Sequence, residues 1–98
     1  MMIVVSMPMA ISQLTSVPAK LHGLSDRGEI RVGAVADLCV IDPRKLALEP
    51  VRVDYDLPAD QPRLVQAGGG FAAVYVAGVR TVADDRPTGA RPGRMLTA

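Results

Sequence analysis

The length of the chain places the strongest limit on its fold. With 98 residues, it can form one small hydrophobic core, and a free-standing (β/α)8 barrel, which needs roughly 250 residues, is excluded. A disordered polymer is excluded as well, because 49% of the residues are hydrophobic and 21% are charged. We therefore expect a single domain that spans residues 1–98.

The charge balance and the cysteine content narrow the possible partners and the compartment. Eleven basic and ten acidic residues leave a net charge of +1 without any basic run, which argues against nucleic acid or an anionic membrane as a partner. Cys39 is the single cysteine, so no internal disulfide can form and we expect a cytoplasmic protein. The apolar start, residues 1–10, lacks the basic region of a signal peptide and the ~20-residue length of a membrane span. We interpret it as the leading edge of a helix or strand, or as an irregular start.

A helical segment is predicted over residues 9–23. Apolar residues recur there at three- and four-residue steps, which places on one helix face Ile11, Leu14, Val17 and Leu21. Pro18 interrupts this pattern and favours two short pieces, the second covering about residues 18–22. Gly23 then supplies the left-handed residue that ends the helix.

The pattern changes to that of strands over residues 28–98. Ile30 and Val32 alternate with charged residues and predict one strand. The apolar run 38–41, bounded by Asp37 and by Asp42-Pro43, predicts a strand buried on both faces. A weaker edge strand is expected within residues 44–57, ended by Pro58 and Pro62.

The strongest hairpin signal comes next. It joins residues 73–76 to 79–83 through Ala77-Gly78, where a type I′ turn requires a positive φ that alanine resists by about 1 kcal/mol or more. Residues 88–94 are expected to cross the surface as an irregular strap. The fold class expected is therefore mainly β, a small β-sandwich or partial barrel with a short N-terminal helical segment.

Residues able to carry chemistry are few. His22 and Cys39 are the only side chains with imidazole nitrogen or thiol sulfur, and metal centres of hydrolases need three or four ligands, often with a spacing such as HxH or CxxC. We therefore predict no metal site. His22 is interpreted as a residue at a helix end and Cys39 as a packed small hydrophobe with a raised pKa. The sequence leaves a Cys39–His22 catalytic pair open without supporting it.

The remaining candidates also have simpler interpretations. Asp37 and Asp42 stand at strand ends, where they resemble catalytic carboxylates but fit better as residues that form turns. The run 68–70, Gly-Gly-Gly, is interpreted as a flexible turn and not as a phosphate-binding loop. Asp84 and Asp85 suit a solvated turn after the hairpin. We therefore predict no catalytic and no cofactor-binding residue in the chain.

Two stretches resemble the C-terminal end of the metal-dependent amidohydrolases. Residues 15–24 read T-x-x-P-A-x-x-x-G-L, and residues 28–38 read G-x-I-x-x-G-x-x-A-D-L, with the D-P pair at 42–43. The later segments 56–59, 63–66, 74–82, 88–89 and 92–94 are similar to the tail of N-acyl-D-amino-acid deacylases, the D-aminoacylase group. The resemblance covers residues 12–96. Ala77 departs from it, because family members usually have Asn-Gly at this hairpin.

The resemblance implies a scaffold without a reaction centre. In the superfamily these patterns mark the last barrel helix and the return to a small β-sandwich, while the metal ligands and the catalytic Asp come from upstream barrel strands. It therefore implies zinc only in a full-length enzyme, and a non-catalytic C-terminal β module whose parent hydrolyses N-acyl (D-)amino acids or related amides. The alternative is a self-sufficient oligomeric scaffold or binding module. An enzyme that acts through Cys39 or an Asp pair ranks third.

A module of this kind exposes apolar surface when it stands alone. We therefore expect a homo-oligomer or a barrel-bearing partner chain. Contact through the helix face of Ile11, Leu14 and Leu21, or through an edge strand, would cover that surface.

Overall fold

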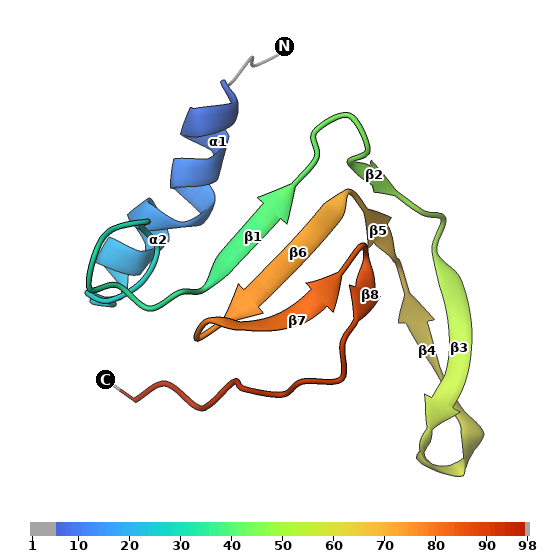
Figure 1. Cartoon of the computed structure of the whole chain (residues 1–98). Helices are drawn as coiled ribbons and strands as arrows, with labels where there is room; N and C mark the ends of the chain where they lie inside the picture. The colour runs from blue at the N-terminus through green and yellow to red at the C-terminus, as the bar shows by residue number, and fades with distance from the viewer. Residues whose placement is uncertain (1–5, 98) are drawn as a thin grey trace.

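The computed structural model describes residues 6–97, which form two short helices, one 3-10 turn and eight strands. In chain order these elements are α1 (Met7–Leu14), α2 (Ser16–Leu21), β1 (Leu38–Ile41), β2 (Ala47–Leu48), β3 (Arg52–Leu57), η1 (Pro58–Asp60), β4 (Gln61–Val65), β5 (Gly68–Gly69), β6 (Phe71–Val76), β7 (Val79–Ala83) and β8 (Arg86–Pro87). The chain is therefore mainly β with a helical start, as predicted, and its described part contains no closed barrel (Figure 1).

The largest unit is a four-stranded antiparallel sheet in the order β1-β6-β7-β8. The predicted hairpin forms its centre, and its turn has φ values of 50° at Ala77 and 79° at Gly78, as a type I′ turn requires. Strand β1 has the predicted bounds and lies at one edge of the sheet (Figure 1). Ala73 of β6 is buried.

The prediction that β1 is buried on both faces was wrong. Cys39 is exposed and Val40 is 50% exposed. The strand makes its main contacts with β6 alone, so its outer edge and part of each face remain uncovered. The apolar run correctly predicted a strand that is suited to burial, but the described chain supplies nothing to bury it.

Two helical pieces form as predicted, but the break between them lies at Thr15, three residues before Pro18. Thr15 has φ −127° and ψ −79°, outside the helical region. Pro18 occupies the first turn of α2, where its missing N–H has no intrahelical partner to lose. Gly23, with φ 72°, ends the helix in the left-handed conformation, as expected.

The strand predicted around Ile30 and Val32 is absent. Residues 27–33 consist of bends, turns and irregular backbone, and Ile30 and Val32 are 90% and 102% exposed. Alternation predicts a strand only where a neighbouring strand can accept its hydrogen bonds. Among residues 6–97, no strand pairs with this segment.

A two-stranded ribbon that the sequence predicted only in part extends from the sheet. Strand β3 confirms the strand expected within 44–57, but β4 was missed because Pro62, interpreted as a terminator, lies within it. Pro62 is tolerated because both strands of a two-stranded ribbon are edges. The Gly68–Gly70 run is likewise not a free turn, since Gly68 and Gly69 form β5 and pair with β2.

We call the hairpin of β3, η1 and β4, residues 52–65, the arm. Its two strands contact chiefly each other and η1. Figure 1 shows the arm projecting from the sheet on the side away from α1 and α2. The arm therefore gains little support from the rest of the described chain.

The molecule has almost no core of its own. Within the described chain the buried hydrophobic residues are Ala19 and Ala73. The accessible surface is 8194 Å², whereas a compact chain of this mass exposes about 5,400 Å². The radius of gyration is 16.2 Å, against about 13 Å for a compact domain of this length. About 2,800 Å² of surface is therefore in excess of what a globular monomer exposes.

Two remaining expectations concern the chain ends. The irregular strap over 88–94 is confirmed, since the described residues after β8 form no helix or strand. Of the apolar start, residues 7–10 begin α1, capped by Ser6, and the expectation for residues 1–5 lies outside the described residues. No helix within residues 6–97 has the length and hydropathy needed to cross a membrane.

Candidate functional site

Asp37 joins the loop after α2 to the central hairpin. Its Oδ1 accepts a hydrogen bond from the backbone N–H of Ala77 at 2.8 Å, and its Oδ2 lies 2.9 Å from Nη1 of Arg27. The backbone N–H of Gly78 also donates to the carbonyl of Ala36 at 3.0 Å. Asp37 was interpreted as a local turn former, and this was wrong: its partners lie 10 and 40 residues away. Each oxygen of the carboxylate thus has a partner within the described chain, and together they fix a turn of the scaffold.

Arg27 is held between two carboxylates. Its Nε lies 3.2 Å from Oδ1 of Asp26, in addition to the contact with Asp37. The hydrogen bond from Arg27 lowers the pKa of Asp26 below its ordinary value, and the bond to Asp26 raises the pKa of Arg27. Asp26 therefore stays ionised at neutral pH, which is unsuited to a general acid.

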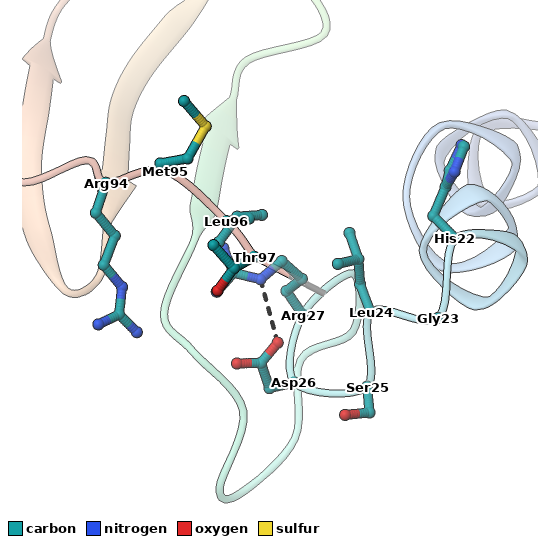
Figure 2. A pocket seen from close by; sticks show the side chains of 10 residues that line it. All are labelled: His22, Gly23, Leu24, Ser25, Asp26, Arg27, Arg94, Met95, Leu96 and Thr97. Carbon is teal, nitrogen blue, oxygen red and sulfur yellow. Dashed lines mark hydrogen bonds and ion pairs between the residues drawn. The ribbon is translucent and has the colours of Figure 1, made fainter.

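The cleft beside this cluster lies between the loop after α2 and the C-terminal strap (Figure 2). It has a volume of about 790 Å³. A neighbouring hollow of about 490 Å³, next to the Ala77 turn, shares Arg27, Arg94 and Leu96 with it. In Figure 2 the imidazole of His22 points away from Asp26 and Arg94. The cleft therefore brings arginines and one carboxylate together, and the imidazole of His22 is not aimed at them.

The donor set does not fit a zinc centre. His22 follows α2, whereas Cys39 lies exposed on β1. The interpretation of Cys39 as a packed hydrophobe was therefore wrong, because β1 makes its main contacts with β6 alone. Among residues 6–97, no three His, Cys, Asp or Glu side chains gather closely enough to hold a metal ion. Zinc sites need at least three such ligands. No step of a reaction can be derived through a metal held by these residues.

Two of the other candidates, Asp42 and Asp85, accept hydrogen bonds from backbone N–H groups. Oδ1 of Asp42 accepts the N–H of Arg44 at 3.0 Å, which confirms Asp42 as a turn former. Asp84 and Asp85 form the expected turn, but Asp85 does more than face solvent. Its carboxylate accepts the N–H groups of Gly70 at 3.2 Å and of Phe71 at 2.7 Å. Sequence reasoning missed Arg27 and the role of Asp85, because Asp37 lies 10 residues from Arg27 and the partners of Asp85 lie 14 and 15 residues from it.

Comparison with known proteins identifies the family to which the chain belongs. The model of the family described as "Amidohydrolase family" matches residues 1–83. The chain belongs to the amidohydrolase family. It is 36% identical over 87 residues to an N-acyl-D-glutamate deacylase from Alcaligenes xylosoxydans xylosoxydans, which covers 89% of this chain and 16% of that protein. It is 36% identical over 92 residues to an N-acyl-D-aspartate deacylase from the same organism, covering 93% of this chain and 16% of the relative.

These amidohydrolases are much longer than the chain described here, which spans 16% of the length of each relative it matches. No solved structure matches the chain significantly. The family assignment agrees with the resemblance carried by the motifs at residues 15–24 and 28–38. In the structure those motifs form α2, the loop that holds Arg27, and the entry to β1. The residues of these two motifs thus build the scaffold.

Proposed function

We propose that this chain is a non-catalytic C-terminal β module of an amidohydrolase, and that the complete enzyme hydrolyses N-acyl D-amino acids by metal-assisted chemistry. The observation that carries the proposal is the missing core: Ala19 and Ala73 are the buried hydrophobic residues of the described chain. A family member with so little buried surface needs a covering partner, and the barrel-bearing part of an amidohydrolase is the natural one.

The helical segment offers the surface for this contact. Leu14 and Leu21 are 76% and 80% exposed, and Val17 and Ile11 are exposed as well. None of these side chains is covered by the sheet, because α1 and α2 make their main contacts with each other. Covering one Leu side chain fully contributes about 1.5–3 kcal/mol, so a partner that covers this segment would be bound strongly enough to complete the fold.

The substrate class rests on the relatives. Both are deacylases of acidic N-acyl-D-amino acids, and cleavage of such an amide by this family would use the metal of the barrel. This chain contributes no ligand to that metal under the proposal, because its one histidine and one cysteine lie on separate elements. Its part is to cover and stabilise the barrel.

Complementation in trans tests the proposal. The N-acyl-D-glutamate deacylase relative is produced without the segment that matches this chain, and the 98-residue chain is added to it. We expect hydrolysis of N-acyl-D-glutamate to rise at least tenfold on addition, and the chain alone to be inactive with or without Zn²⁺. Leu21→Asp should prevent the rise, whereas Val32→Asp, at an apolar residue that is at least as exposed but lies outside the helical segment, should not.

Two results would contradict the proposal. One is hydrolysis by the chain alone, retained after chelation. The other is stoichiometric zinc binding by the chain alone, measured by equilibrium dialysis and lost in His22→Ala.

A further inference from the structure

The cleft between the loop after α2 and the C-terminal strap has a negative charge on one wall and a positive charge on the other. Asp26 belongs to the loop and Arg94 to the strap, and both line the cleft. Figure 2 shows their side chains extending from the two walls towards the same space. Two opposite charges from distant parts of the chain therefore face a common volume.

The guanidinium of Arg94 is available for a partner. Within residues 6–97 it takes part in no ion pair, whereas the neighbouring Arg27 is held by Asp26 and Asp37. A guanidinium is a planar fork of N–H donors that matches a carboxylate through two parallel hydrogen bonds. Arg94 is thus suited to bind a carboxylate that enters the cleft.

The carboxylate of Asp26 also keeps an oxygen for a partner. Its Oδ1 lies 3.2 Å from Nε of Arg27, while Oδ2 forms no ion pair with a described residue, and the side chain is 53% exposed. The hydrogen bond from Arg27 and, to a smaller extent, the charge of Arg94 lower the pKa of Asp26. Asp26 is therefore ionised at neutral pH, and its Oδ2 is suited to accept a hydrogen bond from an ammonium group.

The charges of the two walls select the charges of the ligand. Asp26 and Arg94 form no ion pair with each other, so each retains its charge towards the space between them. A simple anion such as phosphate is attracted by Arg94 but repelled by Asp26, and a simple cation meets the reverse. A small molecule that carries a carboxylate and an ammonium close together satisfies both walls.

We propose that this cleft binds a free α-amino acid, with the carboxylate of the ligand on the guanidinium of Arg94 and its ammonium on Oδ2 of Asp26. One carbon atom joins the two charged groups of such a ligand. Leu24 and Leu96 line the same cleft and offer apolar surface to the ligand's side chain. The cleft volume of about 790 Å³ lies within the range of about 300–1,000 Å³ that is usual for small-molecule sites.

A site of this kind distinguishes the product of a deacylase from its substrate. In hydrolysis of an N-acyl amino acid, water breaks the amide bond, its oxygen goes to the acyl carbon, and the released nitrogen takes up protons and becomes an ammonium. The N-acyl substrate has an uncharged amide at that position and does not satisfy Asp26. This link to the reaction rests on the proposed function, whereas amino-acid binding by the chain does not. If complementation fails and the amino acid binds, the proposed function alone is lost.

NMR titration of the full 98-residue chain with three matched probes tests the site. D-leucine carries both charges, N-acetyl-D-leucine lacks the ammonium, and D-leucinamide lacks the carboxylate. At constant ionic strength, D-leucine should cause saturable shift changes at residues 23–27 and 94–97. Each of the other probes should bind about fivefold or more weakly, because each loses one charge-assisted contact. Equal affinity for the three probes, or the absence of saturable changes, would overturn the proposal.

Substitutions in the two walls complete the test. Arg94→Gln and Asp26→Asn should each weaken D-leucine binding about fivefold or more. Arg91→Gln is the matched control for the first, since it removes the same charge from the strap at a residue that does not line the cleft. Asp60→Asn, in the arm, is the control for the second.

Arg94→Gln decides the question if Asp26→Asn disturbs the loop through Arg27. Arg94 forms no ion pair with a described residue, so its replacement should leave the amide spectrum outside the strap unchanged. Binding of D-leucine that survives Arg94→Gln, or that is weakened equally by Arg91→Gln, contradicts the site.

Discussion

Gly28 lies where the loop after α2 passes against that helix. A Cβ added there would stand 2.6 Å from Cβ of Ala19 and 3.0 Å from the carbonyl oxygen of Thr15, and its φ is +89°. Ala19 is one of the buried residues of the described chain. A small residue on each side of this contact thus allows the loop that holds Arg27 to approach the helix.

The variants Gly28→Ala and Gly33→Ala separate two reasons for a glycine: a left-handed backbone and a lack of space for a Cβ. Both positions have a φ near +90°, but a Cβ at Gly33 meets nothing within 4 Å. We expect Gly33→Ala to cost about 1 kcal/mol for the left-handed backbone. Gly28→Ala should cost roughly 1–3 kcal/mol more because of the overpacking against Ala19. Urea unfolding of both variants measures the difference, and equal losses would show that the helix yields to the added methyl group.

At this scale the sequence predicted local chemistry and missed distant partners. Asp42 accepts a hydrogen bond two residues along the chain, as its position before a proline indicated. Asp37 and Asp85 hold backbone groups of Ala77, Gly70 and Phe71, and no local pattern reports such a contact. For the same reason Arg27, the centre of the ion-pair cluster, was not singled out.

At the scale of elements, the arm shows that an alternating apolar and charged sequence forms a strand only where a second strand pairs with it. The alternation that ends at Leu57 formed β3 because β4 accepts its hydrogen bonds, whereas the same alternation at Ile30 and Val32 found no neighbouring strand and formed turns. The hairpin of β6 and β7 was predicted almost to the residue, since its partner strands are separated by two residues. Sequence reasoning succeeds where the partner is near in the chain.

The ion pair between Asp56 and Arg63 should make the arm sensitive to acid. The hydrogen bond from Arg63 holds the pKa of Asp56 below its ordinary value. The stabilisation is therefore fully present above about pH 4, the ordinary pKa of an unfolded Asp, and is lost as the pH falls through the lower pKa of the folded arm. Because the pair is exposed, the effect should be modest and should weaken in salt.

This loss can be measured by amide exchange or by the chemical shifts of β3 and β4. The measurements start at about pH 6 and go downward, because carboxylates titrate in this range. Asp56→Asn should remove the transition. Asp60→Asn is the matched control, because Asp60 belongs to the arm but forms no ion pair with any described residue. A transition that survives Asp56→Asn would assign the acid sensitivity to another carboxylate.

At the scale of the whole molecule, the chain exposes more surface than a compact monomer of its mass. Nearly half of the residues are hydrophobic, a proportion that predicted a packed core, yet the described chain buries few of them. Composition indicates that a core exists but not which chain completes it. Under the proposed function the barrel completes the core, and the chain spans 16% of the length of each relative it matches.

The heat capacity of unfolding measures that missing cover directly. A compact protein of this length unfolds with a heat-capacity change of about 1.3 kcal/mol/K. The excess 2,800 Å² is already exposed in the folded chain, and with slightly more than half of it apolar, the heat-capacity change should be lower by about 0.4 kcal/mol/K. Thermal melts at several urea concentrations, at dilutions where the chain is monomeric, give this value. The full value of a compact protein in the dilute chain would mean that one copy covers its own apolar faces, and then neither the barrel nor a second copy is needed to complete the fold.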